Sequence, residues 1–211
     1  MLITELTPVG KTRTRVQIDY DRTLVLSNRE LMQYGISADR ELSDENYQEM
    51  LQNLYHQAIR KCGELLKGMD YTEKGLKDKL IQKGFPEETA DAAVDAMKEA
   101  HYIDDRRYAE SYIRSRAEGK SSLRIRMDLK AKGVSESLIR ETFDTWEEQN
   151  GDLLEEKERD QIRELLRKKR YHPQETDRQQ GQKIMAFLMR KGYSAELIRE
   201  VMRSEDYAED F

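Results

Sequence analysis

The sequence has few of the residues that interrupt helices or cross-link chains. Its 211 residues include three prolines and eleven glycines. Because these are the usual breakers of regular structure, helix is the expected default. The single cysteine, Cys62, excludes an intramolecular disulfide and fits a reducing compartment such as the cytoplasm. Signal-peptide and membrane-spanning patterns are missing, so a cytoplasmic protein without a membrane partner is expected.

The sequence also lacks the motifs that carry common chemistry. It contains no glycine-rich phosphate-binding loop, no zinc-protease motif, no nucleophile elbow and no Cys-x-x-Cys pair. His56, His101 and His172 are scattered, and none stands at ligand spacing from Cys62. We therefore expect no catalytic residues, no cofactor and no metal, and a protein that works by binding.

The chain is polar for a folded protein. Charged residues make up 37% of it and hydrophobic residues also 37%, with a mean hydropathy of −0.93. This composition suits small helical modules with much surface rather than one thick core. The formal net charge of −5 argues against a protein that coats DNA through many phosphate contacts, but it allows local basic surfaces.

The first residues differ from the rest. Apolar and polar residues alternate from Arg15 to Tyr20, as in a half-buried strand. A turn at Asp21-Arg22 would return the chain as a second strand over residues 23–26. Residues 3–9 would add a third. The sequence therefore predicts either a β-hairpin or a small three-stranded sheet.

Two helices are expected next. Ser27 followed by Glu30 is a capping box, and Gly35 is placed to end a short helix. Ser43 is a suitable N-cap for a longer helix that reaches Leu66, because apolar residues then recur at helical spacing.

From residue 72 onward a helix–glycine–helix unit recurs three times. The pattern aliphatic-x-x-x-Leu-x-x-Lys-Gly-apolar occurs over residues 76–85, 125–134 and 184–193, and its glycines are Gly84, Gly133 and Gly192. A glycine in this place takes the left-handed conformation that ends a helix, so all three are interpreted as caps rather than site residues.

A third helix is expected after the first two pairs. Asp104 or Asp105 caps one that presents Tyr108 and Ala109 on one face; for this adjacent carboxylate pair we favour capping over catalysis. The predicted fold is mainly α, with tandem three-helix repeats in an elongated curved array. The expected parts are an N-terminal extension over 1–70 and repeats over 71–119, 120–171 and 172–211, the last with a truncated third helix.

Positive charge gathers in three stretches, residues 104–132, 157–170 and 178–203, whereas residues 136–156 are acidic. One basic stretch alone is ordinarily a solvated helix face, but three in a repeat array can line one groove. The residues expected to bind a partner or nucleic acid are Arg107, Arg114, Arg116, Lys120, Arg124, Arg126, Arg167, Lys168, Lys169, Arg170, Arg190 and Lys191.

One motif carries a family resemblance. The run Ile103-Asp104-Asp105-Arg106-Arg107-Tyr108-Ala109, followed by Tyr112, Arg116, Gly119 and the repeat segment at 125–134, resembles the RecX family of bacterial regulators of the RecA recombinase. The segment at 27–36 is similar to the N-terminal extension of longer members. The resemblance covers most of the chain and implies a non-enzymatic modulator of DNA repair and recombination. Such a protein would lie in the groove of the RecA–DNA filament and oppose its ATPase and strand exchange, with local basic patches available to single- or double-stranded DNA.

Two other functions stay open from the residues themselves. Each helix–glycine–helix unit has the outline of a helix-turn-helix DNA reader, although acidic second helices, with Glu87 and Glu88 in the first unit and Glu136 and Glu141 in the second, would repel phosphates. A helical scaffold that binds only protein is the other alternative.

Overall fold

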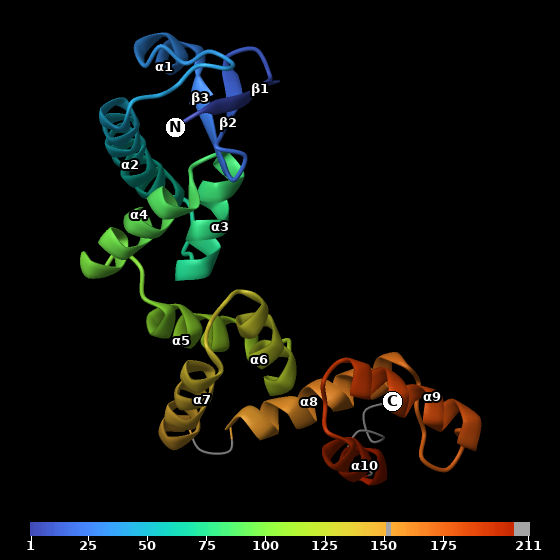
Figure 1. Cartoon of the computed structure of the whole chain (residues 1–211). Helices are drawn as coiled ribbons and strands as arrows, with labels where there is room; N and C mark the ends of the chain where they lie inside the picture. Colours follow the sequence, from blue (N-terminus) through green and yellow to red (C-terminus); the bar gives the residue numbers. More distant parts are fainter. Residues whose placement is uncertain (151–152, 205–211) are drawn as a thin grey trace. The chain divides into compact units, whose positions relative to one another are not determined.

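The computed structural model describes residues 1–150 and 153–204, and this part of the chain holds three strands followed by ten helices (Figure 1). The chain divides into two compact units, residues 1–104 (unit 1) and residues 105–211 (unit 2). The predicted mainly helical fold with an N-terminal sheet is confirmed. The elements are β1 (Ile3–Val9), β2 (Arg13–Ile18), β3 (Arg22–Ser27), α1 (Asn28–Gln33), α2 (Asp44–Leu66), α3 (Glu73–Lys83), α4 (Glu87–Glu99), α5 (Asp105–Arg116), α6 (Ser122–Ala131), α7 (Glu136–Asn150), α8 (Leu153–Lys168), α9 (Arg178–Arg190) and α10 (Ala195–Arg203).

The sheet is antiparallel with the strand order β1-β2-β3, and Val16 pairs with Leu6 on one side and Leu24 on the other. The turn between β2 and β3 was predicted at Asp21-Arg22 but lies earlier. Asp19 and Tyr20 have positive φ angles of 49° and 67°, and the Asp19 carboxylate accepts a hydrogen bond of 2.7 Å from the Leu2 N–H. This side-chain bond and the tolerance of Asp for left-handed backbone explain the earlier turn.

Both predicted helix starts after the sheet are confirmed. Ser27 and Glu30 form the capping box at the start of α1, and Ser43 accepts a hydrogen bond from the Asn46 N–H at the start of α2. The half-buried carboxylate of Glu30 also accepts a hydrogen bond of 2.6 Å from Gln57 on α2. A local cap therefore also ties α1 to the long helix.

The three repeated glycines have nearly the same backbone geometry, with φ of 97° at Gly84, 94° at Gly133 and 96° at Gly192. The predicted left-handed caps are confirmed. In each turn the N–H of the apolar residue after the glycine donates to the carbonyl of the repeated leucine, the closing bond of this cap. These bonds join Phe85 to Leu80 at 3.2 Å, Val134 to Leu129 at 3.1 Å and Tyr193 to Leu188 at 3.3 Å.

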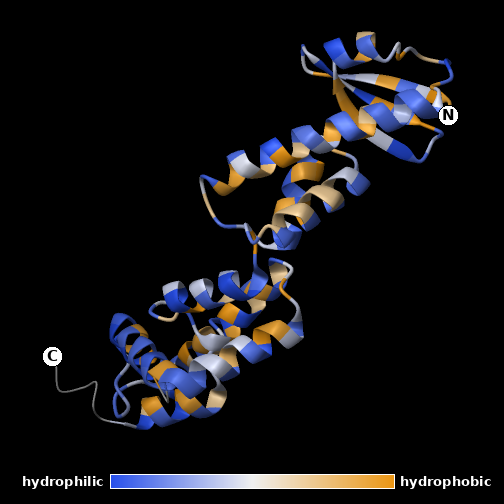
Figure 2. Ribbon diagram, turned by 90° about the vertical axis from the view of Figure 1, so that its left-hand side faces the viewer, coloured by the Kyte–Doolittle hydropathy of each residue, from blue (hydrophilic) through white to orange (hydrophobic). Residues whose placement is uncertain are grey.

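Buried residues form four clusters. The first joins the sheet to α1 and the first half of α2. The other three each join one helix to the pair that follows it: the second half of α2 with α3 and α4, α5 with α6 and α7, and α8 with α9 and α10. Figure 2 shows the hydrophobic residues as interrupted stripes along these helices.

The grouping of helices differs from the expected one. The helix that completes each three-helix group precedes its helix–glycine–helix pair, whereas the expected boundaries at 71, 120 and 172 placed it after the pair. A periodic sequence marks the repeat but not which neighbour shares its core. The short helix expected after residue 203 lies outside the described residues.

In unit 1 the first glycine turn packs against the edge of the sheet. The Val25 N–H donates a hydrogen bond of 3.0 Å to the Gly84 carbonyl. A Cβ on Gly84 would lie 2.5 Å from the Cβ of Val25, so the contact requires glycine. The turn covers part of the outer edge of β3, which would otherwise present open backbone groups.

Candidate functional site

In unit 2 the last glycine turn packs against the start of α6. The hydroxyl of the buried Ser121 caps α6 by accepting from the Arg124 N–H at 3.3 Å, and it donates 2.9 Å to the Lys191 carbonyl. A Cβ on Gly192 would lie 2.5 Å from that hydroxyl oxygen. The contact brings the end of α9 beside the link between α5 and α6.

A hollow of about 470 Å³ lies beside this contact and collects positive charge from all three basic stretches. We call it the basic hollow. Two carboxylates also line it, Glu118 and Glu164. The five lining cations are all among the twelve expected binding residues: Lys120, Arg124, Lys168, Arg190 and Lys191.

Asp128, which does not line the hollow itself, forms ion pairs with two of these cations. Its carboxylate lies 2.5 Å from the Lys120 Nζ and 3.2 Å from the Arg124 Nε, and it accepts 3.2 Å from the Tyr112 hydroxyl. Burial alone would raise the pKa of Asp128, but the hydrogen bonds from Lys120 and Tyr112 and the charge of Arg124 lower it below its ordinary value. The pKa of Lys120 is in turn raised by the hydrogen bond that its ammonium group donates to Asp128. Both partners therefore stay charged at neutral pH.

Both lining carboxylates already have partners. Glu164 pairs with Lys168 at 2.6 Å, and Glu118 pairs with Lys157. Arg190, in contrast, has no ion pair within 4.0 Å among the described residues, and it is exposed. The guanidinium of Arg190 is therefore open to an incoming anion.

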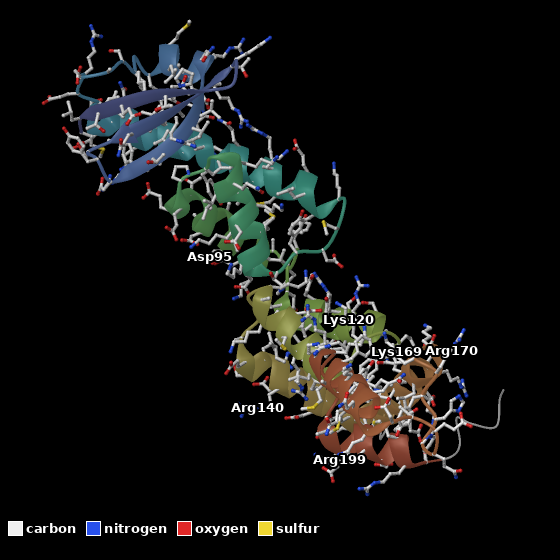
Figure 3. All side chains as sticks on the ribbon, turned by 90° about the vertical axis from the view of Figure 1, so that its right-hand side faces the viewer. Asp95, Lys120, Arg140, Lys169, Arg170 and Arg199 are labelled. Carbon is white, nitrogen blue, oxygen red and sulfur yellow. The ribbon has the colours of Figure 1, made fainter. Side chains whose placement is uncertain are left out.

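Aromatic rings extend the basic surface beyond the hollow. The ammonium groups of Lys169 and Lys191 lie 4.8 Å and 5.3 Å from the centroid of Phe187, close enough for cation–π attraction. Arg170 follows in the turn after α8. Figure 3 shows Lys120, Lys169 and Arg170 along one margin of unit 2, with Arg140 and Arg199 at the opposite margin.

The three arginines expected on α5 do not line the basic hollow. Arg107, Arg114 and Arg116 are exposed, and Arg116 lies 5.6 Å from the centroid of the Tyr112 ring. Tyr112 stacks on Tyr108 with a centroid distance of 6.1 Å. The motif tyrosine Tyr108 is thus part of a ring pair on α5, and the motif alanine Ala109 is fully buried.

Two further cations that were expected to bind a partner also lie outside the basic hollow. Arg126 lies 3.7 Å from the centroid of the buried Phe143 and 3.8 Å from Glu147, so it covers the core of the α5–α6–α7 group. Arg167 is half-buried in α8 and does not line the hollow.

Two residues that sequence reasoning missed support the site. Gln161 on α8 donates 2.7 Å to the Ala117 carbonyl and accepts 2.8 Å from the Tyr193 hydroxyl, which ties three walls of the hollow together. Lys132 lies 5.5 Å from the centroid of the Tyr112 ring. Lys132 had a signal, since it is the repeated lysine before glycine, whereas Gln161 had none.

Residues 1–150 and 153–204 give no support for a metal site, a reactive thiol or a membrane-spanning helix. These residues include no cluster of three or more histidine, cysteine or acidic side chains placed to hold a metal. Burial raises the pKa of the Cys62 thiol to about 11, so it is a poor nucleophile at neutral pH. Within the same ranges no helix combines the length and the apolar character needed to cross a bilayer.

Comparison with known protein families finds three matches in chain order. Residues 58–96 match the first three-helix domain of RecX, residues 104–142 the second and residues 156–202 the third. Each matched range starts in or just before the helix that precedes a glycine pair. The family domains therefore follow the same grouping as the buried clusters.

Relatives and solved structures agree with this match. The chain is 29% identical over 201 residues to the regulatory protein RecX of Clostridium botulinum strain Alaska E43, covering 92% of this chain and 90% of the relative. It is 33% identical over 141 residues to that of Trichlorobacter lovleyi, covering 65% of this chain and 88% of the relative. A crystal structure of regulatory protein RecX has a similar fold, with a TM-score of 0.63 at 21% identity over 96% of this chain and 99% of that one. A crystal structure of RecX from Lactobacillus salivarius gives a TM-score of 0.60 at 21% identity, covering 74% of this chain and 98% of that one.

Proposed function

Because the chain belongs to the RecX family, we propose that it is a non-enzymatic regulator that binds the RecA–DNA filament and modulates the activity of the recombinase. Its relatives carry the name of a regulatory protein. Its action belongs in the cytoplasm, in DNA repair, recombination and the SOS response.

The basic hollow is the observation that carries this proposal. Five cations from three separate segments meet there, and both carboxylates that line it already have lysine partners. Clustered Lys and Arg side chains bind the phosphates of nucleic acid without reading its sequence. This is the mode of contact that a regulator acting on filaments of any DNA sequence requires.

The overall charge favours a filament over naked DNA as the target. With a net charge of −5 the chain gains no long-range attraction to DNA, and fields from its local patches are screened within about 10 Å at 0.1 M salt. The hollow therefore acts over short range, once contacts with the recombinase hold the chain near the DNA.

The helix-turn-helix alternative receives less support. The second helices of the first two pairs carry their acidic residues at or near the surface; on α7, Glu136 pairs with Lys130 and Glu141 with Arg106 at 2.5 Å. A recognition helix in the major groove would bring these carboxylates to the phosphates. The basic hollow instead lies at helix ends and turns.

The test is the rate of ATP hydrolysis by RecA on single-stranded DNA, with and without stoichiometric amounts of the protein. Wild type is expected to lower the rate. The double variant Arg190→Glu/Lys191→Glu should need about tenfold more protein for the same effect, a difference of about 1.4 kcal/mol. Arg140→Glu, at the opposite margin of unit 2, is the matched control and should act like wild type.

The outcomes separate the parts of the proposal. No effect of wild type on the ATPase would contradict the regulatory function. Equal effects of wild type and the double variant would contradict the role of the basic hollow and favour a contact made with protein alone.

A further inference from the structure

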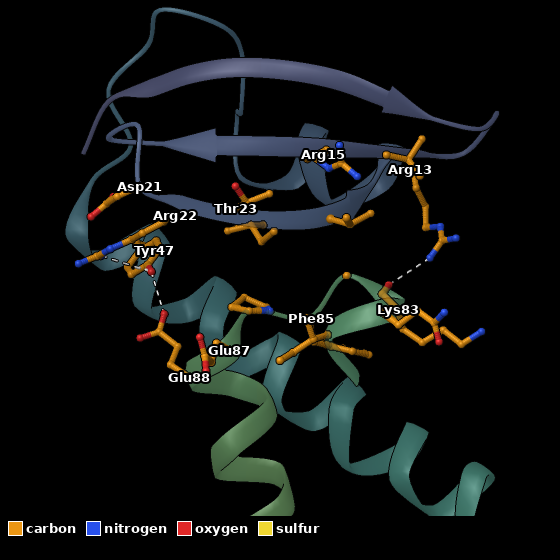
Figure 4. Close-up of a pocket in the computed structure, with 17 residues that line it drawn as sticks. Arg13, Arg15, Asp21, Arg22, Thr23, Tyr47, Lys83, Phe85, Glu87 and Glu88 are labelled. Carbon is orange, nitrogen blue, oxygen red and sulfur yellow. Dashed lines mark hydrogen bonds between the residues drawn. The ribbon is translucent and has the colours of Figure 1, made fainter. Parts of the chain in front are cut away.

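Unit 1 contains a second hollow, of about 780 Å³, between the outer face of the sheet and the turn from α3 to α4 (Figure 4). Eight residues between Val9 and Val25 line it from the sheet and residues 81–88 from the helices, with Tyr47 at one end. We call it the sheet hollow. It is formed entirely by unit 1 and shares no residue with the basic hollow.

The middle of the sheet hollow is apolar. Its walls include Val9, Val25, Ile81, Phe85 and Pro86. Ile81 is 41% exposed, although it is a large aliphatic residue on the last turn of α3. Concave apolar surface of this kind is typical of sites that accept one apolar group.

One end of the hollow is basic. Arg13 reaches from β2 to the end of α3 and donates 3.4 Å to the Lys83 carbonyl, as Figure 4 shows. Arg15 and Lys83 also line this end. Neither side chain has an ion pair within 4.0 Å among the described residues, so both charges are available to a ligand.

The opposite end is mainly acidic. Asp21, Glu87 and Glu88 line it, and the Tyr47 hydroxyl holds Glu88 by a hydrogen bond of 2.9 Å. Arg22 lies there too, 3.4 Å from the same hydroxyl. A ligand of uniform negative charge, such as a nucleic-acid strand along the hollow, would be repelled at this end.

Strand addition is not the binding mode. The outer edge of β3 already uses the Val25 N–H to bond the Gly84 carbonyl, so an added strand could not pair along it. An occupant must be recognised by the apolar middle and by the charges at the two ends.

We propose that the sheet hollow binds a protein segment in which an apolar side chain adjoins a run of acidic residues. The apolar side chain packs against Val25, Ile81 and Phe85, and the carboxylates reach Arg15 and Lys83. The hollow is thus a peptide-docking site between the N-terminal sheet and the turn from α3 to α4. This inference goes beyond the proposed function and does not depend on it.

The experiment measures fluorescence anisotropy of a short labelled peptide, a leucine next to a run of glutamates, with the full chain. Arg15→Glu should weaken binding about tenfold. It should leave the stability of the chain nearly unchanged, since the side chain is exposed. Ile81→Gln should weaken it to a similar extent. Lys79→Glu, an exposed position on α3 that does not line the hollow, is the matched control and should bind like wild type.

Two matched ligands complete the test. A peptide with glutamine for glutamate and one with serine for leucine should each bind at least about tenfold more weakly. Equal binding of the acidic peptide by wild type, Arg15→Glu and Ile81→Gln would overturn the proposal. So would a single-stranded oligonucleotide that binds through Arg15 while the peptide does not bind. Thermal unfolding of each variant shows whether its fold is kept.

Discussion

The hydroxyl of Ser121 bonds the carbonyl of Lys191, 70 positions further along the chain, while the same oxygen caps helix α6. One small buried side chain thus fixes both a helix start and the approach of a distant turn. The basic hollow depends on this contact, because it holds the end of α9 against the start of α6.

Gly192→Ala is expected to loosen this contact. A Cβ at this position would lie 2.5 Å from the Ser121 hydroxyl oxygen, and the backbone φ of 96° is unfavourable for any residue with a side chain. The two effects together should lower the free energy of unfolding by about 2–3 kcal/mol. Urea denaturation of the full chain measures the change. Gly119→Ala, which has open space around it and ordinary φ, is the control and should change little.

Arg170→Gly is expected to stabilise the chain while weakening its binding. Arg170 has a φ of 51°, a left-handed conformation that glycine adopts without strain, so the gain should be about 1 kcal/mol. The variant also removes a cation from the basic surface. The nearby change Lys168→Gly, at the last residue of α8, should instead cost up to about 1 kcal/mol, because it also removes the ion pair with Glu164. A loss of stability in Arg170→Gly would contradict the left-handed conformation of this residue.

Asp128→Asn should strengthen binding of single-stranded DNA. The change releases Lys120 and Arg124 from their carboxylate partner and makes the basic hollow more positive. Anisotropy at several salt concentrations should show a tighter complex with a steeper salt dependence. A weaker complex would mean that Asp128 is needed to orient these two cations.

The same carboxylate gives a pH dependence of stability. The pKa of Asp128 is lowered in the folded chain, so its contribution is present above its ordinary value near 4 and is lost as the pH falls through the lowered value. Urea unfolding should therefore show wild type more stable than Asp128→Asn at neutral pH, with the difference shrinking below about pH 4. A constant difference down to pH 3 would contradict the ion pair.

Cys62 should be unreactive in the folded chain. The thiol is buried, and its pKa of about 11 leaves little thiolate at pH 8. Mass spectrometry after iodoacetamide treatment should find it unmodified in buffer and fully modified in urea. Rapid modification in buffer would show that α2 opens locally around this residue.

Local signals in the sequence predicted local structure well. The capping box of Ser27 and Glu30 and the caps at Gly84 and Gly192 each depend on atoms only a few positions apart. A short motif contains all the residues that such an interaction needs. The turn at Asp19-Tyr20 is the exception among the local features. The carboxylate of Asp19 accepts a hydrogen bond from the N–H of Leu2, which is distant in the sequence.

Contacts between distant segments were not predictable in the same way. Charge counts identified three basic stretches, but only the fold shows that Lys120, Lys168 and Arg190 meet while Arg114 does not line the hollow. The direction of a side chain around its helix depends on which face is buried. That face follows from the grouping of helices, which the repeat alone left open.

The contact between Val25 and Gly84 has a counterpart in unit 2. The last glycine turn presents the carbonyl of Lys191 to a hydroxyl at a helix start, and the first presents the carbonyl of Gly84 to a strand N–H. The sheet thus covers the first glycine turn as the start of α6 covers the last. Repeat modules need neighbouring elements that cover their exposed faces. For the first helix pair, the N-terminal strands provide this cover.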